Sequence, residues 1–270
     1  MGYINENKRE DEVLKRISEL RLLDDALATA ALDGNLKATQ EILRTVTQNS
    51  HMTVTFAKAQ KTVTNLKGRG ARFDLLAIDS KRNAYDLEIQ RTASGASPQR
   101  ARYNSSLMDA LMLDSGETQT KLKKSFMIFF MENDFLGKGL PLYHVERHVK
   151  ETGDAFGDGN TIIYVNGEYR NERTKIGRLV HDFRQTEPDM MYSTVLADAV
   201  RTYKNDENGK EKLMGVMEEL EKKAYDEGVR RSKMEILASM LEIGVDVSTM
   251  AKILKVSERK LKRMIDELDR

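Results

Sequence analysis

Three polar residues in two neighbouring runs of the chain have the types and spacing to hold a metal ion. Asp74 lies in the run 71–78, and Glu88 and Gln90 lie in the run 84–90. Both runs are rich in apolar residues, and five polar residues separate them, a pattern that predicts a β-hairpin with a longer loop. Alternation along the returning strand then places Glu88 and Gln90 on one face, where the hairpin can bring Asp74 close to them.

Two carboxylates on neighbouring strands repel each other, and a divalent cation between them removes that cost. Mg²⁺ prefers hard oxygen ligands and keeps several waters beside one or two carboxylates. Such an ion can polarise a phosphodiester and lower the pKa of a bound water. We therefore expect Asp74 and Glu88 to bind Mg²⁺, with Mn²⁺ as a substitute. The carbonyl of Ile89 is a further candidate ligand, and Gln90 faces the same pocket.

The motifs around these residues resemble those of the PD-(D/E)xK nucleases. The run Gly68-Arg-Gly-Ala-Arg-Phe-Asp74, a hairpin, and Asp86-Leu-Glu88-Ile-Gln90 are similar to the D…ExK signature, with Gln in place of the final Lys. The closest resemblance is to the Rpn-like recombination-promoting nuclease or transposase-like branch, where Glu-x-Gln is followed by a helix carrying Arg-Tyr. Arg102-Tyr103 is similar to that pair. Further similar segments follow in the same order: Phe126–Met131, Asn133–Phe135, Pro141–His144, Gly157–Gly159 and Ile163–Gly167.

The resemblance covers most of the chain and implies a fold and an activity. It implies an α/β, restriction-endonuclease-like core in which helices flank a central mixed β-sheet. It also implies Mg²⁺-dependent DNA endonuclease activity, a role in recombination or mobile elements, and a cytoplasmic, nucleoid-associated location.

The glutamine in place of lysine removes a positive charge that would stabilise the phosphate. Arg72, two residues before Asp74 on the same strand face, is the first candidate to replace that charge, and Arg102 is the second. Tyr103 would pack or hydrogen-bond at the edge of the site. Glu41, on an earlier predicted helix, is a further candidate metal ligand.

Other interpretations of the same residues remain open. The acidic strand is also typical of an edge strand with one face in water. The absent lysine leaves open a DNA-binding or regulatory module with an inactive nuclease core, and the charged helix and tail leave open an assembly scaffold. His144 and His148 have the spacing of a helical zinc pair but lie in a predicted strand region, and Gly153–Gly159 reads as a surface loop.

Periodicity predicts the elements that position the site. Helices are expected at residues 9–32, 36–46, 98–115 and 174–203, and strands from 52 and at 71–78, 84–90, 125–131, 141–146 and 161–165. The strand at 125–131 is apolar on both faces, which is typical of a central strand. Three regions follow: a nuclease-like core at 1–203, a charged helical linker at 204–233 and a C-terminal module at 234–270.

The C-terminal module is predicted to be a helix-turn-helix. Gly244 and the turn at Val256-Ser257 separate three short helical patterns, and Ser257 is a candidate N-cap. The last helix carries Arg259, Lys260 and Arg263, which are candidate DNA contacts. Acidic residues dilute this charge, so DNA binding and self-association as a homodimer are equally supported.

Composition is that of a well-solvated protein with a packed core. The 270 residues are 40% hydrophobic and 32% charged, with a net charge of +1 and no cysteine. The lack of cysteine excludes disulfides and thiolate metal sites and suits the cytoplasm. No apolar run approaches the length of a membrane span, so no membrane partner is expected.

Overall fold

The computed structural model describes residues 2–64 and 70–268 and divides into two compact units, residues 1–216 and 217–270. Gly68 and Arg69 of the nuclease-like motif lie outside the described residues. The division between the units falls inside the predicted linker. Each unit is therefore described by itself.

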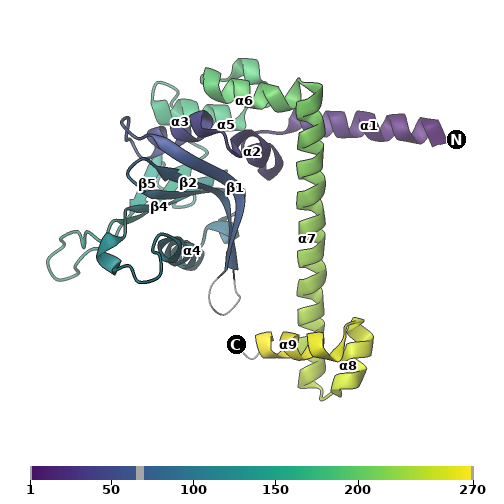
Figure 1. The fold of residues 1–270 in the computed structure, drawn as a ribbon. Helices are drawn as coiled ribbons and strands as arrows, with labels where there is room; N and C mark the ends of the chain where they lie inside the picture. Colours follow the sequence, from purple (N-terminus) through teal and green to yellow (C-terminus); the bar gives the residue numbers. More distant parts are fainter. Residues whose placement is uncertain (1, 65–69, 269–270) are drawn as a thin grey trace. The chain divides into compact units, whose positions relative to one another are not determined.

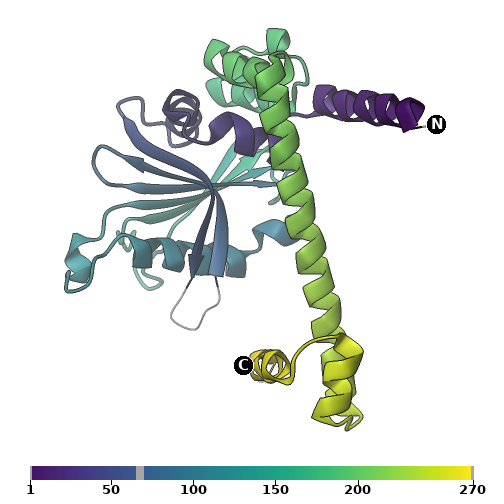
Figure 2. The same cartoon turned by 45° about the vertical axis from the view of Figure 1, so that its right-hand side comes forward.

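The first unit is built on a mixed six-stranded sheet of the described residues, in the order β1-β2-β3-β4-β6-β5 (Figures 1 and 2). The strands are β1 Val54–Thr64, β2 Gly70–Asp79, β3 Ala84–Gln90, β4 Ser125–Met131, β5 Leu142–Val145 and β6 Asn160–Asn166. β3, β4 and β6 are parallel, whereas β1, β2 and β3 form an antiparallel meander and β5 pairs antiparallel with β6. This arrangement confirms the predicted α/β core with a central mixed sheet.

β3 lies inside the sheet, between β2 and β4. Every residue of β3 is buried except Gln90, which is partly buried. The interpretation of this strand as an edge strand with a wet face is therefore wrong. The physical reason is the crossover after β3, because its helix returns the chain to lay β4 parallel to β3 and so covers the free edge.

Helices cover both faces of the sheet (Figure 1). The crossover helix α4 (Pro98–Leu111) packs on one face, where its Ala101 joins Met127 and Phe129 of β4 in one apolar cluster. The other face is covered by α2 (Asp25–Leu32), α3 (Leu36–Val46), α5 (Lys175–Arg184) and α6 (Thr194–Lys204). Phe183 of α5 stacks on Phe130 of β4 with 4.0 Å between ring centroids. Successive residues of each strand point to opposite faces of the sheet, so their side chains pack in two separate apolar layers.

Several predicted boundaries are confirmed, and others are corrected. The helix at 36–46 and the strands at 84–90 and 125–131 have the predicted bounds. The helix expected at 9–32 is instead two helices, α1 (Gly2–Glu19) and α2, because the Asp24 carboxylate accepts the backbone N–H of Arg21 at 2.8 Å in a turn between them. The helical region 174–203 is likewise split, with a short 3₁₀ turn at Pro188–Met190 between α5 and α6.

The second unit contains most of α7 (Glu207–Glu242), followed by α8 (Val247–Leu254) and α9 (Glu258–Leu268). The first of the three predicted tail helices is therefore the end of the 36-residue α7. Ser257 caps α9, as predicted, by accepting the N–H of Lys260 at 3.3 Å. Leu237, Met250, Leu254 and Leu261 form part of a small core in this unit. None of the described helices is long and apolar enough to cross a membrane.

Candidate active site

The two predicted metal ligands lie where β2 and β3 separate. The register pairs Leu75 with Leu87 and Leu76 with Asp86, so its continuation places Asp74 opposite Glu88. The backbone pairing of β2 with β3 ends at Leu75. Beyond this point, side-chain carboxylates accept the backbone N–H groups of the two strands. The Ile89 N–H donates to Asp74 Oδ2 at 3.2 Å, and the Asp74 N–H donates to Glu88 Oε1 at 3.4 Å. Both carboxylates therefore occupy the opening between the strands.

Burial makes these carboxylates costly to ionise. Burial, then the charges of Glu88 and Asp25, raises the pKa of Asp74 to about 8. Burial also raises the pKa of Glu88, whose side chain is 0% exposed, although the Arg100 guanidinium works against that rise. A cation in the opening would relieve both carboxylates.

Asp86 is a third acid at the site, and sequence reasoning gave it no role. The residue is 0% exposed, and neither carboxyl oxygen has a hydrogen-bond partner among the described residues. Burial, then the charges of Glu88 and Asp74, holds the pKa of Asp86 well above its usual range. The spacing Asp86-x-Glu88 places both acids on one strand face and was the signal in the sequence for Asp86. Burial of that face depends on β4 and α4, which the spacing alone does not show.

The cation that faces the carboxylates from α4 is Arg100, and the prediction of Arg102 is wrong. Arg100 Nη2 lies 2.6 Å from Glu88 Oε2, whereas Arg102 is exposed. Residues two positions apart in an α-helix are separated by about 200° around its axis, so Arg100 and Arg102 point to nearly opposite sides of α4. The N-cap of α4 fixes where the helix begins and therefore which of its residues face the sheet: Ser97 accepts the Arg100 N–H at 3.2 Å.

Asp25 is the further acid near Asp74, and the prediction of Glu41 is wrong. Asp25, the first residue of α2, lines a cavity of about 10 Å³ together with Asp74 and Ile89. Burial raises the pKa of Asp25, and the charge of Arg72 opposes the rise. Arg72 therefore lies near this group of acids, as predicted. Glu41 instead lines a different cavity between α3 and α5.

Gln90 reaches the carboxylates, as its place on the strand face predicts. Its Nε2 donates to Glu88 Oε2 at 3.3 Å. Its Oε1 lies against Gly95, where an added Cβ would be only 1.7 Å away. Tyr103 is partly buried at the edge of an apolar cluster that includes Phe73 and Leu107, which agrees with the packing role among its two predicted roles.

The donor set fits a divalent cation held by few protein ligands. Partly buried Asp74 and fully buried Asp86 and Glu88 face one arginine, so ionising all three would leave an excess of negative charge that a cation would offset. Among the described residues, no three His, Asp or Glu side chains are already grouped to hold a metal. Two carboxylates with waters, the usual arrangement for Mg²⁺, therefore fit better than an all-protein cage. The Ile89 carbonyl faces the same opening, because a strand residue directs its N–H and C=O to the same neighbour.

The candidate DNA contacts of the C-terminal module lie on α9. Arg259, Lys260 and Arg263 are all exposed, whereas Leu261 and Met264 of the same helix are buried. Arg230 of α7 pairs with Glu267 of α9 at 2.7 Å within this unit. Exposure leaves the three basic side chains available to phosphates.

In a comparison with protein-family models, the chain matches the PD-(D/E)XK nuclease family transposase over residues 31–179. The matched segment spans more than half of the chain and includes β2, β3, α4 and β4 with the carboxylates between them. No curated protein and no solved structure matches the chain.

Proposed function

Because the chain belongs to the PD-(D/E)XK nuclease family transposase family, we propose that it is a divalent-metal-dependent DNA endonuclease that hydrolyses phosphodiester bonds. The observation that carries the proposal is the pair of carboxylates in the opening between β2 and β3, partly buried Asp74 and fully buried Glu88. A role in recombination or transposition, and a cytoplasmic, nucleoid-associated location, are part of the same proposal.

Asp74, Glu88 and the Ile89 carbonyl would hold Mg²⁺, or Mn²⁺ in its place. When bound there, the ion would act as a Lewis acid and would lower the pKa of a bound water. Gln90 positions the water or a phosphate oxygen through its amide. Arg100 supplies the charge that the missing lysine would provide, because its guanidinium is already 2.6 Å from Glu88. Arg72 contributes a second positive charge near Asp25.

A plasmid-cleavage assay tests this proposal, with Mg²⁺, Mn²⁺, Ca²⁺ or EDTA and with Asp74→Ala and Glu88→Ala variants. Cleavage by wild type in Mg²⁺ or Mn²⁺ that is lost in EDTA and in both variants supports it. Arg102→Ala is the matched control, since that exposed arginine lies off the site. Full metal-dependent cleavage by a folded Asp74→Ala variant would show that the assignment is wrong.

The C-terminal module would dock DNA or join two copies of the chain. The exposed side chains of Arg259, Lys260 and Arg263 motivate the DNA role. Replacing all three by Ala should weaken DNA binding and lower its salt dependence by roughly one unit of log–log slope per lost phosphate contact. Unchanged binding, together with dissociation of a dimer, would assign the module to self-association.

A second candidate function is DNA binding with an inactive nuclease core. Gln90 in place of lysine and the pairing of Arg100 with Glu88 favour it, because both reduce the charge available to the phosphate. Salt-dependent DNA binding by the folded protein, without cleavage in any divalent metal, would select this function over the endonuclease.

A further inference from the structure

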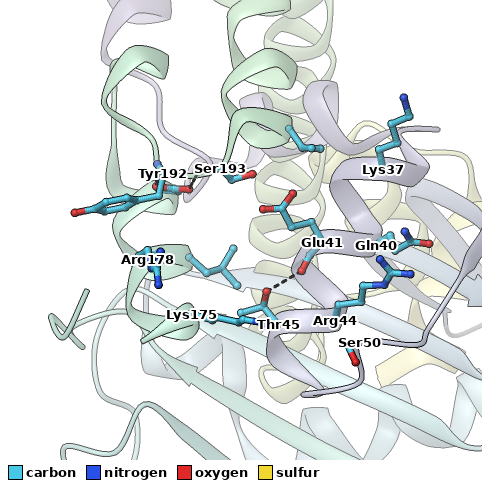
Figure 3. A pocket seen from close by; sticks show the side chains of 13 residues that line it. Lys37, Gln40, Glu41, Arg44, Thr45, Ser50, Lys175, Arg178, Tyr192 and Ser193 are labelled. Carbon is cyan, nitrogen blue, oxygen red and sulfur yellow. Dashed lines mark hydrogen bonds between the residues drawn. The ribbon is translucent and has the colours of Figure 1, made fainter. Parts of the chain in front are cut away.

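A cavity of about 600 Å³ lies in the helical layer of the first unit, away from the carboxylates. Its walls come from α3, from α5 and from the turn that enters α6 (Figure 3). It shares no lining residue with the small cavity at Asp74. Its volume falls in the range of small-molecule sites.

The cavity is lined by an excess of positive charge. Four basic residues line it: Lys37, Arg44, Lys175 and Arg178. Arg44 uses its Nε–H to bind the Met52 carbonyl at 2.8 Å, which leaves its other N–H groups free to reach a ligand. In the described part of the chain, none of the four forms a salt bridge. Because these four cations outnumber the two acids of the lining, Glu41 and Asp182, the cavity favours an anion.

The two acids in the lining, Asp182 and Glu41, differ in whether they can accept a hydrogen bond from a ligand. Asp182 is 1% exposed, and its carboxylate accepts the backbone N–H groups of Tyr192 and Ser193, each at 2.8 Å. Glu41 lies opposite Tyr192 and Ser193 in Figure 3 and can accept hydrogen bonds from hydroxyl or amino groups of a ligand. The cavity therefore combines basic side chains from α3 and α5 with one acceptor that a ligand can reach.

Two helices begin at the cavity and add to its positive potential. Lys175 opens α5, whose N-cap Thr174 accepts the Gly177 N–H at 3.0 Å. Ser193 caps α6 by accepting the Leu196 N–H at 3.1 Å. The positive ends of both helix dipoles thus reinforce the four side chains.

Tyr192 offers a flat surface beside the cations. The residue is 52% exposed. Its hydroxyl donates to Glu172 at 2.6 Å, the Arg178 guanidinium carbon lies 6.0 Å from the ring centroid, and His181 packs against the ring at 4.8 Å. A ring held in this way can stack on a nucleobase, and such stacking tolerates any base.

We propose that this cavity binds a nucleoside phosphate, with the phosphate on these basic side chains, the base on Tyr192 and a hydroxyl or amino group on Glu41. The ligand is either a free nucleotide or the phosphorylated terminal nucleotide of a DNA chain. The proposal stands apart from the nuclease activity, because it needs none of the carboxylates between β2 and β3.

Titration calorimetry in EDTA, at about 50 mM salt where phosphate contacts are strong, tests the proposal. The probes are dAMP, deoxyadenosine and inorganic phosphate, and a short oligonucleotide with a 5′-phosphate or a 5′-hydroxyl. Arg178→Ala and Lys175→Ala should each weaken dAMP binding by about tenfold or more, the loss of one charge-assisted hydrogen bond. Arg173→Ala is the matched control, because this exposed arginine lies two residues before Lys175 and outside the lining.

The role of the base is tested by Tyr192→Leu and Tyr192→Phe. Leucine should weaken dAMP binding and leave phosphate binding unchanged, whereas phenylalanine should keep both. A 5′-phosphorylated oligonucleotide that binds more tightly than dAMP, and more tightly than its 5′-hydroxyl form, identifies a DNA end as the source. Tighter binding of dAMP identifies a free nucleotide.

Three results would overturn the proposal: no dAMP binding by wild type, whether or not an oligonucleotide binds; an equal loss in Arg173→Ala; or equal affinity for dAMP and phosphate. An Asp74→Ala variant should bind dAMP like wild type. That result separates the cavity from the nuclease centre, so either proposal can fail while the other stands.

Discussion

Replacing Asp74 by asparagine should stabilise the metal-free protein at high pH. The pKa of Asp74 is about 8 in the folded protein, against an ordinary value of 3.8. The folded protein therefore holds this proton more tightly, and the stability that it contributes is complete below about pH 4 and is lost as the pH rises through about 8. Asparagine keeps an oxygen to accept the Ile89 N–H but carries no charge.

The size of the effect follows from the two pKa values. Each pH unit between them corresponds to about 1.4 kcal/mol, so the loss for Asp74 reaches roughly 4 kcal/mol at neutral pH. Glu88 and Asp25 share the repulsion, and a proton bound by either one relieves part of it. We therefore expect Asp74→Asn to raise the free energy of unfolding by about 1–3 kcal/mol at pH 8 and by about zero near pH 4.

Urea unfolding in EDTA, followed by circular dichroism at both pH values, measures this difference. Asp79→Asn is the matched control on the same strand, because the Asp79 carboxylate accepts hydrogen bonds from Asn83 and from the Tyr85 hydroxyl. That control should lose about 1–2 kcal/mol. With Mg²⁺ at pH 8, wild type should gain stability and Asp74→Asn should not. The reasoning is refuted if Asp74→Asn is no more stable than wild type at pH 8, or if its gain is equal at both pH values.

Three further predictions concern how neighbouring residues hold the site and how the helices pack. Arg100→Ala should lower the free energy of unfolding by about 1–3 kcal/mol, because a fully buried carboxylate loses its ion pair; Arg102→Ala, measured in the same urea titration, should change it by less than about 0.5 kcal/mol. Gly95→Ala should displace the amide of the motif's terminal glutamine and slow metal-dependent plasmid cleavage with little change in melting temperature, and unchanged cleavage would remove that amide from the mechanism. Gly215→Ala in α7 meets nothing within 4 Å and should stabilise by about 0.5–1 kcal/mol, whereas Gly209→Ala places a Cβ 1.7 Å from a backbone oxygen and should destabilise; thermal melts that rank the two the other way would contradict the packing of α7.

The register of the acidic hairpin was predictable because it is local. Alternation, the polar turn and the apolar residues between Asp74 and Gln90 determine which side chains share a face. The same local rules predicted β4 as a central strand and Ser257 as the cap of α9. Each of these features depends on residues close together in the chain, where periodicity and capping carry the information.

The partners of the carboxylates came only from the tertiary structure. The rotation of α4 about its axis decides that Arg100, and not Arg102, meets Glu88, and periodicity from one apolar stripe does not resolve a shift of two residues. The burial of Asp86 depends on β4, which pairs on the far side of β3 after a crossover. Asp25 reaches Asp74 from a separate helix.

The sequence by itself determined the family motif, the hairpin that carries it and the order of the elements. The tertiary structure decided which distant residues meet. Glu41 does not lie at the carboxylates but lines a cavity with Lys175, Arg178 and Tyr192, which are more than 130 positions further along the chain. The physical reason is that local preferences act over a few residues, whereas charge and burial at a site depend on every element packed around it.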